Sequence, residues 1–269
     1  MPDLVAVDMG GTSYDVSIVN SGRTRLVTEG TVDGLPVRLP MIEIRTIGSG
    51  GGSIASLEES GRLRVGPESA GAKPGPVCYR RGGTEPTVTD ANVVLGRIDP
   101  DYFLGGAMSL DADGAKKAIL ERVANPLMLS VEEAAEGILR IAVSRLAGAI
   151  RLSLFEKGLD PEDFTLLSFG GASGLHACDT ADEIGIGRVV FPRDPGTLSA
   201  WGILYSDIVH ALDVAPEAVS IEGVEITEGS MIMHAADKAG TYIPHFCYHK
   251  KLSIAANCRM CLVDVEKAP

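Results

Sequence analysis

The segment that most constrains the fold is a pair of β-like runs joined by a glycine-rich turn. Residues 4–8 (LVAVD) form a short apolar run that ends in Asp8. Residues 14–19 (YDVSIV) alternate apolar and polar side chains, as a half-buried strand does. Gly10 and Gly11 lie between the two runs. The pattern predicts a β-hairpin, and therefore a sheet near the start of the fold.

The middle of the sequence changes from loop-like to helical. Residues 66–100 are rich in glycine and proline, and we expect an irregular loop there. A helix is expected over residues 111–127, capped by its first residue, an aspartate. Ser130 and Glu133 form a capping-box pattern in front of a long amphipathic helix over residues 131–157. Its apolar positions recur at helical spacing and predict a core stripe of Ile138, Ile141, Leu146, Ile150 and Leu154.

Strands and helices alternate in the next part of the chain. Residues 164–169 (FTLLSF) and 188–192 (RVVFP) have the apolar pattern of buried strands. Helix-like segments follow them, at residues 174–184 and 197–211. Hairpins followed by helix, strand, helix and strand predict an α/β fold with layered sheet and helices.

The character of the sequence changes near residue 213. Residues 213–218 (DVAPEA) form a short polar link, and two brief strand-like runs around Gly223 come after it. We therefore expect two domains, one over residues 1–212 and one over residues 219–269.

Charge and composition argue against several classes of protein. The formal net charge is -12, whereas binding to nucleic acid or to anionic membranes requires a basic surface. No run of about 18 apolar residues is present, so we expect no membrane insertion. The five cysteines occur without a recognisable signal peptide, which favours the cytoplasm and favours metal sites over disulfides.

The first glycine-rich turn has the residues that an anion site needs. Backbone N–H groups converge readily where Gly10 and Gly11 carry no side chain, and Thr12 and Ser13 add hydroxyl donors. Asp8 can hold Mg²⁺ through water beside a phosphate. The motif by itself is equally compatible with a plain hairpin turn.

A second glycine-rich turn lies between an expected strand and an expected helix. This position can receive a nucleotide, although small residues there also serve close packing of strand and helix. The turn contains Gly170, Gly171 and Ala172. His176 follows it, and we expect a packed or capping histidine rather than a base. Cys78 and Cys178 are isolated in sequence and are expected to be small buried residues.

The end of the chain carries three clustered cysteines. Cys247, Cys258 and Cys261 follow a C-x10-C-x2-C spacing, and thiolates on a tight loop suit an iron–sulfur centre. His245 and His249 raise the alternative of zinc, but their separation from the C-x2-C arm fits no common zinc finger.

Longer strings in residues 3–212 resemble one enzyme family. DMGGTSYDVS resembles the second phosphate loop of the actin/sugar-kinase/Hsp70 superfamily, and FGGASGLHA resembles its adenosine loop. The strings TIGSGGGSIA, GRIDPDYFLGG and FTLLSFGGASGLHACDTADEIGI are similar to the A subunit of hydantoinase/oxoprolinase enzymes. The resemblance implies an actin-like (ribonuclease H-like) half-domain that uses ATP to open cyclic amides such as hydantoins or 5-oxoproline. Relatives in the same family carboxylate ketones.

The resemblance also implies site residues and partners. It gives phosphate or Mg²⁺ contacts to Asp8 (the catalytic candidate), Gly10, Gly11, Thr12 and Ser13, and adenosine contacts to Gly170, Gly171 and Ala172. Asp90 and Asn92 match a family signature without an assignable chemical step. The implied partners are a B subunit and an N-terminal half that carries the first phosphate loop. Without them, we expect no cyclic-amide hydrolysis by this chain.

Residues 219–269 resemble the N-terminal [2Fe–2S] ferredoxin-like domain of the NADH–quinone oxidoreductase G subunit, an α+β (β-grasp) fold. The resemblance implies cluster ligation by Cys247, Cys258 and Cys261. In that family a fourth cysteine follows, and this chain ends at Pro269 before it. The domain is therefore expected to be truncated.

Three interpretations of the whole chain remain open from the sequence. The first is a segment of an ATP-dependent cyclic amidohydrolase, and the second is an electron-transfer module. The third is a non-functional chimera of the two. Nucleotide binding favours the first interpretation, and visible absorbance from bound iron and sulfide favours the second.

Overall fold

The computed structural model describes residues 2–28, 30–32, 35–37, 41–205, 219–221 and 224–226. The chain divides into two compact units, Met1–Tyr205 and Ser206–Pro269.

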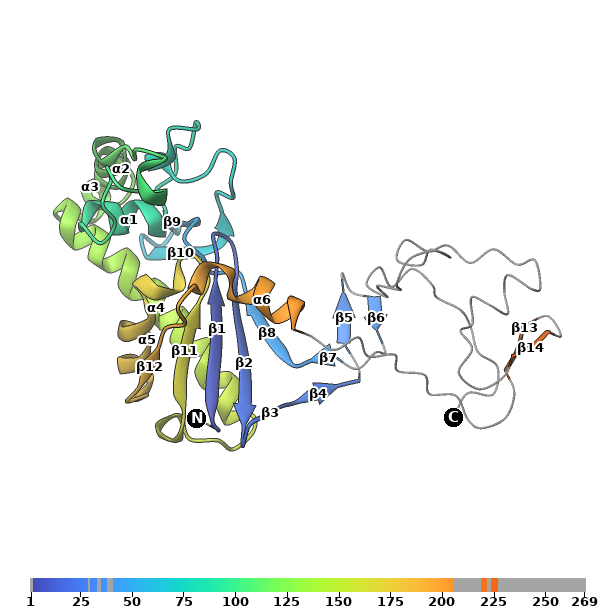
Figure 1. Cartoon of the computed structure of the whole chain (residues 1–269). Coiled ribbons are helices and arrows are strands. Elements are labelled where there is room, and N and C mark those ends of the chain that lie inside the picture. Colours follow the sequence, from blue (N-terminus) through green and yellow to red (C-terminus); the bar gives the residue numbers. More distant parts are fainter. Residues whose placement is uncertain are drawn as a thin grey trace. The chain divides into compact units, whose positions relative to one another are not determined.

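A six-stranded mixed sheet forms the centre of the first unit (Figure 1). Its strands run in the order β12-β11-β1-β2-β3, with β8 also paired to β2. The strands are β1 (Leu4–Met9), β2 (Tyr14–Asn20), β3 (Arg23–Thr24), β8 (Ile44–Ile47), β11 (Thr165–Phe169) and β12 (Val189–Val190). β1 and β2 pair antiparallel, whereas β1, β11 and β12 run parallel. The predicted first hairpin and the predicted α/β class are confirmed.

One face of this sheet packs against two helices, α4 (Val131–Phe155) and α5 (Ala177–Ile184) (Figure 1). Side chains alternate along β1, so Val5, Val7 and Met9 are buried on the helix side while the residues between them are half-buried. The same core contains the second half of α4, including Leu146, Ile150 and Leu154.

A second core surrounds the first half of α4. It contains α1 (Val88–Val94), α2 (Ala112–Ile119) and a hairpin of β9 (Ser53–Leu57) and β10 (Leu63–Ser69). Figure 1 shows these elements grouped at one end of α4, away from the large sheet. Ile138 is fully buried in this core, and Ile141 packs against it partly buried. The predicted apolar stripe is therefore confirmed, and it serves two cores on one helix.

The loop prediction for residues 66–100 is only partly right. β10 continues to Ser69, a short 3-10 turn covers Val77–Tyr79, and α1 begins at Val88. α1 forms because Thr87 and Asp90 make a capping box, in which each side chain accepts a hydrogen bond from the other residue's backbone.

The other predicted helices are present, but some of them begin or end at residues other than the predicted ones. Asp111 caps α2, which continues through a π-helical turn (Leu120–Ala124) into α3 (Asn125–Leu127). The Ser130–Glu133 capping box in front of α4 is present. The segment expected as one helix over 174–184 divides into a 3-10 turn (Ser173–Leu175) and α5. α6 covers Leu198–Leu204, and the rest of the 197–211 prediction, beyond Tyr205, lies outside the described residues.

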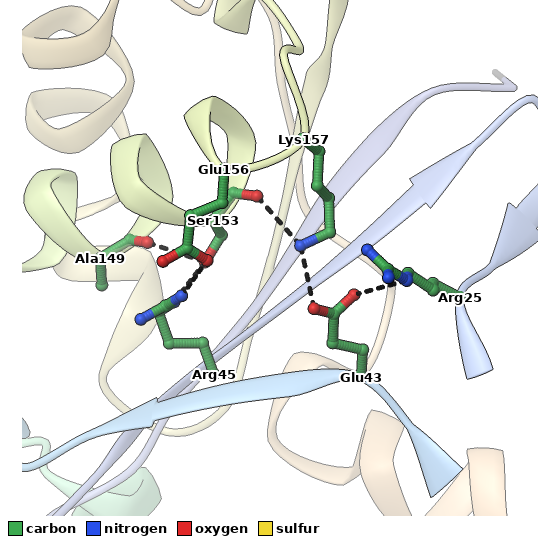
Figure 2. A network of polar contacts seen from close by, with 7 residues as sticks. All are labelled: Arg25, Glu43, Arg45, Ala149, Ser153, Glu156 and Lys157. Atoms are coloured by element: carbon green, nitrogen blue, oxygen red, sulfur yellow. Dashed lines mark hydrogen bonds and ion pairs between the residues drawn. The ribbon is translucent and has the colours of Figure 1, made fainter. Parts of the chain in front are cut away.

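Polar contacts fix the end of α4 to β8, the strand that leads into the glycine-rich residues 48–52 (Figure 2). The Arg45 guanidinium, on β8, donates to the Ser153 hydroxyl at 3.1 Å and pairs with Glu156. The Lys157 ammonium donates to the Glu43 carboxylate at 3.0 Å and to the Ser153 carbonyl at 3.2 Å. A lysine at a helix C-terminus is favourable because the carbonyls there carry partial negative charge.

Smaller hairpins complete the described structure. In the first unit, β4 (Leu26–Val27) pairs with β7 (Met41–Ile42), and β5 (Gly30–Val32) pairs with β6 (Leu35–Val37). In the second unit, β13 (Val219–Ile221) and β14 (Val224–Ile226) pair antiparallel, as predicted. The 213–218 link and the cysteines Cys247, Cys258 and Cys261 lie outside the described residues. Within the described part, no helix has the length and hydrophobicity to cross a bilayer.

Candidate functional site

Three glycine-rich segments meet at one edge of the central sheet. The first (residues 10–13) follows β1 and the third (residues 170–173) follows β11. β1 and β11 are parallel neighbours, with Asp8 opposite Phe169, so their carboxyl ends emerge side by side. The second segment (residues 48–52) connects β8 to β9 and packs onto the first. The carboxyl edge of parallel strands is where open α/β sheets bind ligands.

The first segment presents unused backbone donors. The Gly10 N–H donates to the Ser13 carbonyl at 3.2 Å and closes the turn. Gly11 and Thr12 are exposed, and no hydrogen bond within the described residues uses either amide. Adjacent free N–H groups in a turn form a concavity that suits an anion. The geometry therefore fits a phosphate group at this turn.

The second segment supports the first through direct backbone contact. The Gly51 N–H donates to the Gly10 carbonyl at 3.0 Å, and the Gly52 N–H donates to the Gly11 carbonyl at 2.7 Å. A Cβ atom at Gly50 would lie 2.6 Å from backbone atoms of Gly11 and Thr12. Sequence reasoning gave this segment no part in the site, although its three consecutive glycines were the available signal.

The third segment is held against β1. The Ala172 N–H donates to the Met9 carbonyl at 2.9 Å, and the Gly170 N–H donates to the Pro195 carbonyl at 2.9 Å. Gly170 has a φ of +91°, and a Cβ atom there would lie 2.2 Å from the Asp8 carboxylate. The structure thus brings the two predicted loops into contact at Asp8.

Two carboxylates lie on the sheet face opposite α4. Asp8 and Asp15 are cross-strand partners, so their side chains share this face. Asp8 accepts a hydrogen bond from the Ser199 hydroxyl, and Asp15 accepts one from Thr46. Within the described residues, no three His, Cys, Asp or Glu side chains form a metal-binding group. The pair suits Mg²⁺, which commonly uses one or two carboxylates together with substrate phosphates.

Asp90 has a structural role in the described fold. Its fully buried carboxylate accepts hydrogen bonds from the backbone N–H groups of Val77, Cys78 and Thr87 and from the Thr87 hydroxyl, at 2.8–3.2 Å. The carboxylate therefore joins the Val77–Tyr79 turn to the start of α1. Cys78 is buried as predicted, and burial raises the pKa of its thiol.

The prediction for Cys178 is wrong, because this residue is exposed. It follows Ala177, which is buried in the core beneath the sheet, so the first turn of α5 places the two side chains in different surroundings.

His176 is a packed histidine, as predicted. It is 1% exposed, and burial lowers its pKa to about 4, with a further contribution from Arg97. The Asn92 side-chain amide donates to the Val88 carbonyl at 2.9 Å and lies 3.4 Å from the His176 Nε2 atom. The imidazole is neutral near pH 7, so it carries one proton.

We expect the free energy of unfolding to fall as pH falls below about 6.5 because of His176. The unfolded chain binds a proton near pH 6.5, whereas the folded chain resists protonation until about pH 4. The loss reaches about 3 kcal/mol near pH 4. Urea denaturation at several pH values, on the full chain and on His176→Gln, measures it. A pH dependence that is unchanged by the substitution would show that His176 is not its source.

The fold and the site define an α/β protein with a cluster of glycine-rich turns at the carboxyl edge of its main sheet. The hydantoinase/oxoprolinase family matches residues 1–212. The chain belongs to this family. A 2Fe-2S iron-sulfur cluster binding domain matches residues 218–269.

Known relatives are longer than this chain. It is similar to the caprolactamase alpha subunit of Pseudomonas jessenii, with 43% identity over 84% of this chain and 33% of the relative. It is similar to the acetophenone carboxylase gamma subunit of Aromatoleum aromaticum, with 46% identity over 82% of this chain and 30% of the relative. The crystal structure of the ATP-dependent caprolactamase from Pseudomonas jessenii superposes with a TM-score of 0.71 and 45% identity, covering 77% of this chain and 30% of that one. The chain thus spans about a third of the length of these relatives.

Proposed function

We propose that the first unit is the actin-like half of an ATP-dependent enzyme that opens cyclic amides. Three glycine-rich segments meet beside Asp8, and within the described residues the Gly11 and Thr12 N–H groups have no hydrogen-bond partner. This observation carries the proposal. Relatives named as a caprolactamase and as an ATP-dependent enzyme support the reaction class. In such chemistry ATP phosphorylates a carbonyl oxygen and turns a poor leaving group into a good one.

The strand arrangement supports the actin-like (ribonuclease H-like) assignment. Three antiparallel strands, β1 to β3, continue through β1 into the parallel strands β11 and β12. The two hairpin strands hold the phosphate turn between them, and the parallel strand holds the adenosine turn beside it. One sheet therefore presents both ends of a nucleotide site.

Each predicted site residue has a role in this proposal. The unused amides of Gly11 and Thr12 and the Ser13 hydroxyl line the phosphate position, Gly10 closes the turn through its bond to the Ser13 carbonyl, and Asp8 holds Mg²⁺ through water. Gly170, Gly171 and Ala172 receive the adenosine. Bound Mg²⁺ would neutralise phosphate charge, while the turn fixes the orientation of the phosphates.

Calorimetric titration of ATP with Mg²⁺ into the full chain tests the proposal. The critical variant is Gly11→Asp, which places a carboxylate beside the phosphates. A Cβ atom at Gly11 meets nothing within 4 Å, so the fold accepts the substitution. We expect Gly11→Asp to weaken ATP binding at least tenfold and Gly11→Ala to change it by less than threefold. Absence of ATP binding, or equal affinity in Gly11→Asp, would reject the site.

The substrate and partners follow from the same proposal. The substrate class is a small cyclic amide, and the partners are a B subunit and an N-terminal half that supplies the other side of the nucleotide cleft. The named relatives include subunits called alpha and gamma, which is consistent with a multi-subunit enzyme. We place the protein in the cytoplasm.

For the second unit we propose an iron–sulfur electron-transfer segment of the type found in the NADH–quinone oxidoreductase G subunit. The match to a 2Fe-2S domain over residues 218–269 supports it, with Cys247, Cys258 and Cys261 as thiolate ligands. Anaerobic reconstitution with iron and sulfide tests this assignment, since a [2Fe–2S] centre absorbs visible light. Long-read sequencing across the codons for residues 200–230 tests whether one gene encodes both units.

A further inference from the structure

Two of the hydrophobic cores of the first unit pack on one long helix, α4. The sheet core uses the second half of α4, from Leu146 to Leu154, and the other core uses its first half, from Val131 to Ala142. The glycine-rich segments divide between the two parts. Residues 10–13 and 170–173 extend from the large sheet, whereas residues 48–52 lead into β9 of the second core. The site therefore depends on how the two parts are held together.

Near the site, polar side chains connect the two parts. Asn92, on α1 of the second core, contacts His176, which directly precedes α5 of the sheet core. The Arg97 guanidinium, just after α1, donates to the Asp179 carboxylate of α5 at 2.8 Å and to the Leu175 carbonyl at 3.4 Å. Beside these contacts, α4, α5 and the residues just after α1 leave a cleft of about 560 Å³, lined in part by Arg97 and Asp179. The two parts therefore contact each other here through specific polar groups.

The Asn92–His176 contact is buried and directional. Both residues are 1% exposed. One N–H of the Asn92 amide is used by the Val88 carbonyl, so the other points to the His176 Nε2 atom, which must accept. The imidazole proton is then on Nδ1. Arg97 and Asp179 are the charged groups that act on this ring.

This junction retains an energetic cost. Within the described residues, the Asn92 Oδ1, His176 Nδ1 and Thr180 Oγ1 atoms are buried without a hydrogen-bond partner. Such an atom lowers stability, because it gives up its hydrogen bonds to water on folding and gains none in the protein. Apolar side chains would pack here without that cost, and native proteins leave few buried polar atoms unpaired. The Asn92–His176 contact therefore fixes how the two parts meet, at the expense of some stability.

Helix α1 links this junction to the phosphate turn. One helical turn before Asn92, the Thr89 hydroxyl and N–H both donate to the Gly51 carbonyl at 2.8 Å. The Gly51 N–H in turn donates to the Gly10 carbonyl. Helix α1 thus makes two contacts. Thr89 contacts Gly51 of the second glycine-rich segment, and Asn92 contacts His176.

We propose that Asn92 and His176 form a latch between the two parts of the unit, and that this latch positions residues 48–52 against the phosphate turn. Asn92 is a positioning residue: it acts through α1 and Thr89 on Gly51, and touches neither ATP nor substrate. The nucleotide part of this inference rests on the proposed function. Without the latch, we expect residues 48–52 to lose their hydrogen bonds to Gly10 and Gly11, while both cores stay folded.

Hydrogen exchange and nucleotide titration of the full chain test the latch. The variants are Asn92→Ala, His176→Leu and His176→Gln, of which the last keeps an acceptor near the Nε2 position. Val88→Ala is the matched control, because it removes buried apolar contacts of the same helix and keeps the backbone carbonyl that accepts from Asn92. We expect the Gly51 and Gly52 amides to exchange about tenfold faster in Asn92→Ala and His176→Leu than in Val88→Ala. His176→Gln should stay within threefold of wild type.

Ligand affinity gives a second readout. A latch predicts that Asn92→Ala weakens ATP binding about tenfold and changes adenosine binding by less than twofold, because the adenosine turn stays on β11. A merely structural role would weaken both ligands together. Equal exchange in Asn92→Ala and Val88→Ala would overturn the latch. If the wild type binds no ATP, the proposed function fails, and the exchange comparison still decides the latch.

Discussion

Gly170→Ala should destabilise the first unit by about 3 kcal/mol or more and abolish the nucleotide binding proposed above. Gly170 has a φ of +91°, which a residue with a side chain adopts only at a cost. The added Cβ atom would also lie 2.2 Å from the Asp8 carboxylate and 2.6 Å from the Met9 carbonyl oxygen. Backbone atoms of a central strand cannot move away without breaking the β1–β11 pairing.

Gly171→Ala provides the matched control for this prediction. Its Cβ atom meets nothing within 4 Å, so we expect stability within about 0.5 kcal/mol of wild type. Urea denaturation followed by far-ultraviolet circular dichroism compares the two variants on the full chain. Equal midpoints for Gly170→Ala and Gly171→Ala would mean that the turn at residues 170–172 does not approach Asp8 closely.

Substituting asparagine for Asp90 should cost about 2–3 kcal/mol of stability. The carboxylate accepts four hydrogen bonds through its two oxygens, and an amide would turn an NH2 group toward at least one of those donors. Since the site is fully buried, water cannot replace the lost acceptor. The Val77–Tyr79 turn should loosen first, and the buried Cys78 thiol should then react faster with a thiol reagent.

Asp101→Asn is the control for charge and composition, because Asp101 is exposed. Denaturation midpoints and rates of Cys78 modification should differ between the two variants, with Asp101→Asn close to wild type. The exposed Cys178 gives an internal reference for reagent activity. If Asp90→Asn and Asp101→Asn behave alike, Asp90 does not hold the turn, and its place in the family signature needs another explanation.

Local sequence patterns predicted most of the regular structure. The alternation in residues 14–19 predicted β2, and the Ser130–Glu133 pair predicted the start of α4 to the residue. These features succeed because capping and periodicity depend on neighbours within one or two turns. The missed helix α1 carried the same kind of signal in Thr87 and Asp90, hidden within a stretch rich in glycine and proline.

The sequence predicted only part of the candidate site. Glycine-rich turns after apolar runs predicted where two parts of the site begin, because only glycine permits such backbone geometry at Gly170. The sequence could not show that residues 48–52 complete the site, since that follows from a close approach between distant backbones at Gly50 and Gly11. It also gave no reason to pair Asn92 with His176.

The sequence by itself determined the family, the two-part architecture and the α/β class of the first unit, and it predicted the chemistry of each glycine-rich turn. Tertiary structure alone decided which turns meet, which carboxylates share a sheet face and which polar groups are buried together. The physical reason is the distance along the chain over which each interaction acts. Capping, periodicity and glycine conformations are set by a few adjacent residues, whereas the meeting of residues 10, 51, 92 and 176 requires the packing of both cores on α4.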